Sequence, residues 1–166
     1  MTAAASAFRT YSRPTEHSMT SNSSHARGTV ILGVAASDAH AVANQLIAHD
    51  LREHGYTVIN LGTCTPVSEF ANAALDNPEA LAILIGSLNG HIHEDLRDLA
   101  KAQKSGAIRC PVVVGGNLSV GSHKSDDAIE KLFCLGVDIV LSDAAELPEL
   151  LQRLSLDAAA AQRSAS

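Results

Sequence analysis

The sequence predicts a single doubly wound α/β domain built on a five-stranded parallel sheet. From residue 28 onward, short apolar runs alternate five times with amphipathic helical runs. The strand-like runs are apolar along their whole length and do not alternate with polar residues, which is typical of parallel strands covered by helices on both faces. The chain has 166 residues, 46% of them hydrophobic, which is enough for one folded core. Right-handed crossovers and the common five-strand solution favour the sheet order 2-1-3-4-5.

The predicted strands are the β-branched and aliphatic runs of this alternation. Each run is short and is followed by a loop or a helical pattern rather than by another strand. In chain order they cover residues 29–35 (TVILGVA), 56–62 (YTVINLG), 80–87 (ALAILIGS), 110–116 (CPVVVGG) and 137–142 (VDIVLS).

The predicted helices follow the strands one by one. Gly55 marks the end of the first helix. Thr65 is the expected N-cap of the second, with Pro66 at its first position and Glu69 near a capping-box position. In the third, leucines recur at helical spacing, with acids in the first turn and lysines in the last. The five helices cover residues 39–54, 65–77, 93–106, 126–136 and 145–154.

The two ends of the chain have a different composition. Residues 1–27 are rich in Ser, Thr and Ala without the apolar stretch of a secretory signal, so we expect a disordered N-terminal tail. Residues 157–166 predict a second disordered tail. The domain itself is therefore expected over residues 28–156.

Charge and cysteine usage exclude several classes of protein. The net charge is −6, from 12 basic and 18 acidic residues with no basic cluster, so nucleic acid is not an expected partner. No apolar run approaches the ~20 residues that span a bilayer, so no membrane association is expected. The three cysteines are far apart, which indicates small buried hydrophobes in a soluble, cytoplasmic protein rather than disulfides or a zinc site.

Ligands of such a sheet bind beyond the carboxyl ends of the strands, near the switch between strands 1 and 3. The loops there read ASDAHA after strand 1, GSLNGHIH after strand 3 and GGNLSVGSH after strand 4. A phosphoacceptor receiver domain needs an aspartate at the end of strand 3 and a lysine after strand 5, and the sequence has neither at those positions. The loop after strand 1 also lacks the G-x-G-x-x-G of a dinucleotide site. With 3% aromatic residues, the chain also has little to stack on a flavin.

What remains at this edge is an acid–histidine pair and a double glycine. Imidazole binds transition metals, and a carboxylate behind the ring fixes its tautomer. One histidine cannot complete an all-protein metal site, so Asp38 and His40 favour a metal held in a macrocycle, and Gly115–Gly116 would let a flat group approach the backbone. Alternatively, Asp38 is a helix N-cap, the Ser87 hydroxyl bonds a backbone group at the end of its strand, and the glycines form a tight turn.

These three segments resemble the cobalamin-binding module with its D-x-H-x-x-G, S-x-L and G-G signature. ILGVAASDAHAVANQLIAHDLREHGYTVINLG, GSLNG and VVGGNLSVG occur in the expected order at the expected elements. The chain is most similar to the small subunits of coenzyme B12-dependent glutamate (methylaspartate) mutases, over about residues 29–154. One departure is Ala43, which stands where the signature has its glycine.

The resemblance implies a flavodoxin-like domain that binds adenosylcobalamin with its nucleotide tail detached and buried. His40 would be the axial ligand to cobalt, with Asp38 hydrogen-bonded behind it, and Ser37, Ala39 and Ala41 would flank it. The tail would be held on one side by Gly86, Ser87 and Leu88, with the Ser87 hydroxyl near the base, and on the other by Gly115, Gly116, Asn117, Leu118 and Ser119.

The resemblance further implies an isomerase subunit that is active only in a complex. The reaction would be the radical interconversion of L-glutamate and threo-3-methylaspartate. The substrate site would lie on a separate barrel-type large subunit, in a heterotetramer of two small and two large subunits. One alternative is a cobalamin carrier or sensor without isomerase activity, such as a corrinoid methyl-transfer protein, and another is a purely structural partner.

The other histidines are expected at turns, helix ends and the protein surface. His91 and His93 alternate like zinc ligands, but a turn and helix start explain their acidic neighbours, and a rim position near a partner subunit is the better functional interpretation. His49 and His54 are expected to be solvated or capping on the first helix. His123 lies in a polar loop and would touch the corrin side chains.

Overall fold

The computed structural model describes residues 26–116 and 126–164 of the chain. Its strands form one parallel sheet with the order β2-β1-β3-β4-β5, which confirms the predicted fold class and strand order. The strands are β1 (Thr29–Val34), β2 (Thr57–Asn60), β3 (Ala82–Ser87), β4 (Val112–Gly116) and β5 (Ile139–Leu141).

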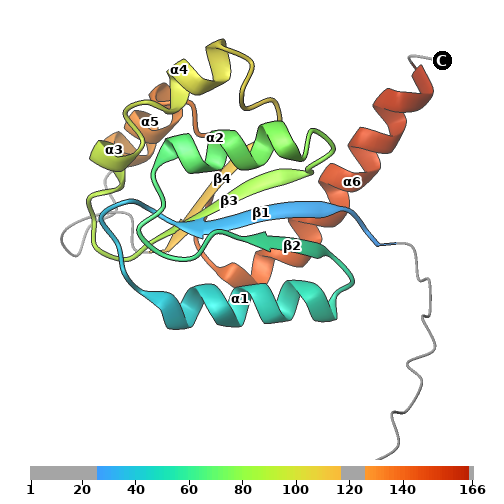
Figure 1. Cartoon of the computed structure of the whole chain (residues 1–166), viewed down its shortest axis with the longest axis horizontal. Helices are drawn as coiled ribbons and strands as arrows, with labels where there is room; N and C mark the ends of the chain where they lie inside the picture. The colour runs from blue at the N-terminus through green and yellow to red at the C-terminus, as the bar shows by residue number, and fades with distance from the viewer. Residues whose placement is uncertain (1–25, 117–125, 165–166) are drawn as a thin grey trace, which may run out of the picture.

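Helices cover both faces of the sheet. In Figure 1, α1 and α6 lie on one face, and α2, α4 and α5 lie on the other. The helices are α1 (Ala41–Glu53), α2 (Val67–Asp76), α3 (Ile92–Asp95), α4 (Leu99–Lys104), α5 (Asp126–Cys134) and α6 (Leu147–Ser164), with a 3₁₀ turn η1 (Ala144–Glu146) before α6. Within the described residues, no helix has the length and apolar character needed to cross a membrane.

Two apolar cores stabilise this three-layer domain, one on each face of the sheet. Alternate residues of β1 separate them, since Ile31 belongs to one core while Val30 and Leu32 belong to the other. Phe70 of α2 is the largest buried side chain of the first core, and Leu51 of α1 is fully buried in the second. Burial on both faces explains why the strands are continuously apolar in sequence.

The strand register brings the loops of interest to one edge. Val34 of β1 pairs with Gly86 of β3, and Gly86 pairs in turn with Gly115 of β4. The loops that follow these strands therefore start side by side, as the sequence predicts for the carboxyl edge of a parallel sheet.

The predicted helix over residues 93–106 is wrong as a continuous element, because the structure divides it into α3 and α4. The backbone N–H groups of Arg97 and Leu99 donate to the third residue back, Glu94 and Leu96, rather than to the fourth. These tighter turns let Leu96 and Leu99 both face the core, where each is 1% exposed.

The predicted N-cap of the second helix is also wrong. Pro66, not Thr65, precedes α2, and no side chain caps it. The N–H of Thr65 instead donates to the carbonyl of Val34, in an isolated bridge that extends the end of β1. A contact between segments far apart in sequence thus overrides the local capping pattern.

The C-terminal segment differs from its prediction as a disordered tail, because α6 continues to Ser164. Four of the eight residues 157–164 are alanines, which have the highest helix propensity, and they continue a helix that is docked by Leu147, Leu150 and Leu151. The predicted N-terminal tail lies outside the described residues, apart from Ala26 and Arg27 at its end.

Cysteine burial was predicted incorrectly for two of the three thiols. Cys64 and Cys134 are exposed, and Cys110 is partly buried. Cys64 lies in the connection between β2 and α2 with a positive φ of 55°, and Cys134 ends α5. Neither position is part of a strand or of the core-facing side of a helix, so the apolar character of the residue did not decide its place.

Candidate cobalamin-binding site

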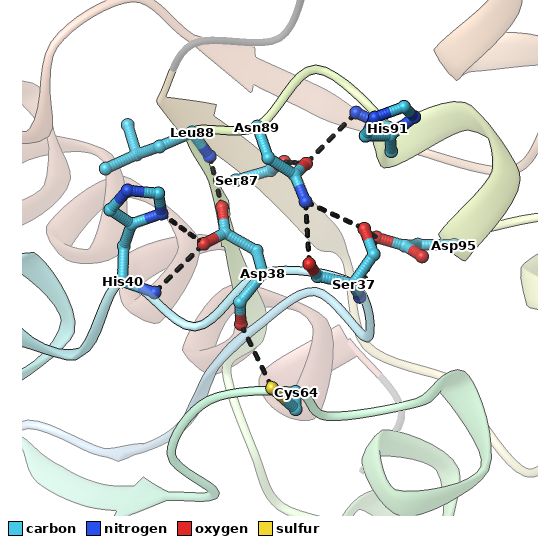
Figure 2. A network of polar contacts seen from close by, with 9 residues as sticks. All are labelled: Ser37, Asp38, His40, Cys64, Ser87, Leu88, Asn89, His91 and Asp95. Carbon is cyan, nitrogen blue, oxygen red and sulfur yellow. Dashed lines mark hydrogen bonds and ion pairs between the residues drawn. The ribbon is translucent and has the colours of Figure 1, made fainter.

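The loop after β1 places a histidine ring against a buried carboxylate. The Asp38 side chain is buried, and its Oδ1 accepts hydrogen bonds from the His40 backbone N–H at 2.9 Å and from the ring Nδ1 at 2.5 Å. Its Oδ2 accepts from the Leu88 N–H at 2.5 Å, as Figure 2 shows. One carboxylate therefore joins the loop after β1 to the loop after β3.

This arrangement determines which ring nitrogen is available. Because Nδ1–H donates to Asp38, the neutral ring carries its lone pair on Nε2. The His40 side chain is 60% exposed, whereas Asp38 is 0% exposed. The structure thus presents an accessible imidazole with a carboxylate behind it, as metal-ligating histidines usually have.

The carboxylate is stabilised in its charged form. Burial raises the pKa of Asp38. The hydrogen bonds from the N–H groups of Leu88 and His40 and the interaction with the His40 ring lower it by more, so the pKa lies below its usual value. Asp38 is not the N-cap of α1, because His40 occupies that position without a side-chain cap. The N-cap alternative for Asp38 is therefore excluded by the structure.

A second polar network braces the same two loops. Ser37 Oγ donates to Asp95 Oδ2 at 2.7 Å, and Asn89 Nδ2 donates to the Ser37 carbonyl at 2.8 Å. Asn89 Oδ1 accepts from Ser87 Oγ at 3.3 Å and from the His91 N–H (Figure 2). The sequence interpretation missed Asn89 and Asp95, since Asp95 lies 58 residues from Ser37 and no local pattern links them.

A cleft of about 300 Å³ opens between the carboxyl ends of the strands and the start of α1. Its walls are mainly apolar, and His40 lines it together with Ser87. The structure adds a wall that the sequence did not indicate, formed where β5 leads into η1 and α6. The described lining comprises Leu32, Gly33, Val34, His40, Ala43, Asn44, Ile47, Leu84, Ile85, Gly86, Ser87, Leu88, Val113, Gly115, Gly116, Leu141, Ser142, Asp143, Ala144 and Leu147.

The predicted site residues divide into three groups. Those that line the cleft are His40, Gly86, Ser87, Leu88, Gly115 and Gly116. Those that flank or support His40 without lining the cleft are Ser37, Asp38, Ala39 and Ala41. The third group, Asn117, Leu118 and Ser119, lies outside the described residues, as does His123.

The two glycines of the predicted wall have different reasons to be glycine. Gly116 has a φ of +110°, and a Cβ there would overlap the carbonyl oxygen of Ser87, so the backbone itself requires glycine. A Cβ on Gly115 would meet Leu141 at an ordinary 3.7 Å. At Gly115 the fold tolerates a side chain, and the missing Cβ instead leaves room in the cleft.

The remaining histidines contribute to local structure. His91 is exposed and its backbone N–H is held by Asn89, while burial lowers the pKa of His93, with a smaller effect of Lys131. No group of three or more potential metal ligands occurs among residues 26–116 and 126–164. His54 caps the C-terminus of α1 and its Nδ1 lies 2.8 Å from the Asp50 carbonyl, while His49 is exposed, so the solvated or capping assignment is confirmed.

The fold and the site together define a flavodoxin-like domain with a cleft at the carboxyl edge of its sheet, beside a carboxylate-backed imidazole. The family model described as the B12 binding domain matches residues 28–150. The chain is 43% identical over 114 residues to the glutamate mutase sigma subunit of Halobacterium salinarum, covering 69% of this chain and 76% of that protein. It is 35% identical over 129 residues to glutamate mutase sigma subunit 2 of Haloarcula marismortui, covering 78% and 86%.

The chain belongs to the B12-binding domain family, among the glutamate mutase sigma subunits. A solved structure with the same fold is a methanol:cobalamin methyltransferase complex from Methanosarcina barkeri, with a TM-score of 0.65. It is 23% identical and the match covers 82% of this chain but 50% of that one, so it supports the fold alone.

Proposed function

We propose that this chain is the adenosylcobalamin-binding subunit of a mutase that interconverts L-glutamate and threo-3-methylaspartate by a radical mechanism. The observation that carries the proposal is the His40 imidazole, held by the buried Asp38 carboxylate at the mouth of the cleft. The relatives at 34–43% identity are named glutamate mutase subunits, which favours this function over a methyl-transfer carrier.

The residues present fit the cofactor. The Nε2 of His40 is accessible for cobalt, and a cleft of about 300 Å³ suits a nucleotide-sized group. Gly86 and Gly115 leave room at its floor, and Ser87 offers a hydroxyl. We include Asn117, Leu118 and Ser119 in the proposed second wall. When bound, adenosylcobalamin supplies the radical chemistry through its cobalt–carbon bond.

The protein's own contribution is orientation and electronic tuning. The hydrogen bond from His40 Nδ1 to Asp38 fixes the tautomer and makes Nε2 a stronger ligand. The Leu88 N–H holds the same carboxylate from the other loop, so the ring orientation is coupled to the wall of the cleft. His40 would thereby hold the cobalt in place of the cofactor's own base, and the cleft would hold the nucleotide.

The substrate site is proposed to lie on a partner. Among the described residues that line the cleft there is no Lys or Arg to pair with the carboxylates of glutamate. The sigma-subunit names of the relatives imply a larger partner. We propose a barrel-type large subunit, in a heterotetramer of two small and two large chains, that carries the residues for the amino acid.

Electron paramagnetic resonance of bound Co(II) cobalamin tests the proposal. With ¹⁵N-histidine-labelled protein, we expect a nitrogen superhyperfine pattern that changes with the label and is lost in His40→Ala. His49→Ala is the matched control, because His49 is an exposed histidine of α1 outside the cleft lining. A spectrum in which cobalamin's own base stays bound to cobalt, with the large subunit present, would contradict the assignment of His40.

A further inference from the structure

Asn44 is a buried polar residue in a largely apolar cleft. It lies in the first turns of α1, directly after Ala43, and both residues line the cleft with His40. Asn44 is 3% exposed, although the residues on either side of it are exposed. Its side chain therefore points inward, between α1 and the sheet.

The orientation of the Asn44 amide is fixed by a neighbour. Asn44 Nδ2 donates to Asn60 Oδ1 at 2.8 Å, and Asn60 Oδ1 also accepts from the Gly62 N–H at 2.9 Å. Because the Gly62 N–H requires an acceptor, the oxygen of Asn60 must face this junction. Asn44 must then turn its NH₂ group toward Asn60, and its oxygen is directed elsewhere.

Asn44 Oδ1 is buried and has no hydrogen-bond partner among the described residues. A buried unpaired acceptor destabilises a protein unless something else donates to it. The side chains that line the cleft with Asn44 include Ile47, Leu32 and Leu84, which have no hydrogen-bond donor.

We propose that Asn44 Oδ1 accepts a hydrogen bond from the nucleotide tail of the bound corrinoid. The donor would be an O–H or N–H group of the tail, either a ribose hydroxyl or an exocyclic amino group on the base. This inference rests on the proposed function and adds to it a residue that recognises the tail from the α1 side. Among the described residues that line the cleft, Ser87 at the end of β3 and Ser142 after β5 carry the side-chain hydroxyls.

The test measures corrinoid affinity of the full chain for ligands that differ only in the tail. The ligands are cobalamin, whose tail has ribose hydroxyls but no amino group on the base, an adenine-containing corrinoid with both, and cobinamide, which has no tail. We expect Asn44→Ala to weaken cobalamin binding about tenfold, as for one lost hydrogen bond, and to leave cobinamide binding unchanged. A larger loss with the adenine corrinoid than with cobalamin would identify the amino group as an additional donor; a loss confined to the adenine corrinoid would identify it as the sole donor.

Gln45→Ala is the matched control, because Gln45 is the exposed amide that follows Asn44 on α1 and does not line the cleft. Asn44→Leu is a second variant that keeps the bulk of the side chain. Unchanged affinity of both Asn44 variants for the tailed corrinoids overturns the inference, and so does an equal loss for cobinamide or in Gln45→Ala. If the wild-type protein binds the tailed corrinoids no more tightly than cobinamide, this result contradicts the proposed function itself, and the inference that rests on it is contradicted as well.

Discussion

Replacing Asp38 by asparagine removes the charge that joins the two loops of the site and keeps the size of the side chain. The carboxylate accepts three hydrogen bonds, two from His40 and one from the Leu88 N–H. An asparagine has one oxygen, and its NH₂ group would face at least one of these donors. Because a hydrogen bond to a charged group contributes about 1.5–3 kcal/mol, we expect the free energy of unfolding to fall by about 2–3 kcal/mol at pH 7.

The pH dependence gives the same prediction a second test. The pKa of Asp38 is lowered in the folded state, so the folded protein binds this proton less tightly than the unfolded chain, whose pKa is about 3.9. The carboxylate therefore stabilises the fold fully above the unfolded value, and the contribution is lost as the pH falls through the folded value. The difference between the wild type and Asp38→Asn should be constant from pH 7 to 5 and shrink below about pH 4.

Urea unfolding followed by circular dichroism at pH 7, 5, 4 and 3.5 measures this difference. Asp50→Asn is the control, because Asp50 is 58% exposed and lies 3.6 Å from His54, so its change should stay within about 0.5 kcal/mol. The reasoning would be refuted by equal stabilities of Asp38→Asn and the wild type at pH 7. A difference that persists unchanged at pH 3.5 would refute the charge as its cause.

Three further predictions concern the cleft and the thiols. Gly116→Ala should lower the free energy of unfolding by about 2–3 kcal/mol, because Gly116 has a positive φ and an added Cβ would overlap Ser87. Gly115→Ala should unfold like the wild type but should bind cobalamin more weakly in a titration. Ala43→Gly should destabilise the unliganded protein by about 1 kcal/mol in urea unfolding, since glycine is a poor helix former, and equal stability would contradict this. Burial raises the pKa of the Cys110 thiol, so Cys110 should react with a disulfide reagent at pH 8 more slowly than exposed Cys64, as measured in single-cysteine variants; equal rates would refute it.

Some site features are predictable because they are local in the sequence. Asp38 and His40 are two residues apart in the chain. They follow the apolar run of β1, and this position predicts that they lie at the carboxyl edge of the sheet. Gly115 and Gly116 end β4 in the same way. For these residues, the alternation of strands and helices was sufficient, since parallel strands bring their carboxyl ends together.

The failures involve contacts between distant segments. Thr65 bonds to Val34 rather than capping a helix, and Asp95 accepts from Ser37 rather than only starting a helix. Capping patterns describe neighbours within a few residues, whereas these partners meet only once the sheet has formed. Asn44 reads as an ordinary polar residue of an amphipathic helix until its burial and its bond to Asn60 are seen.

The sequence by itself determined the strand–helix alternation, the parallel sheet and the edge at which the loops meet, because hydrophobic periodicity and short-range turn chemistry are written in consecutive residues. Only the tertiary structure decided which oxygen of Asp38 each loop engages, that β5, η1 and α6 close the cleft, and that Asn44 Oδ1 is left unpaired among the described residues. Burial and hydrogen-bond pairing are properties of segments brought together in space, and no spacing along the chain encodes them.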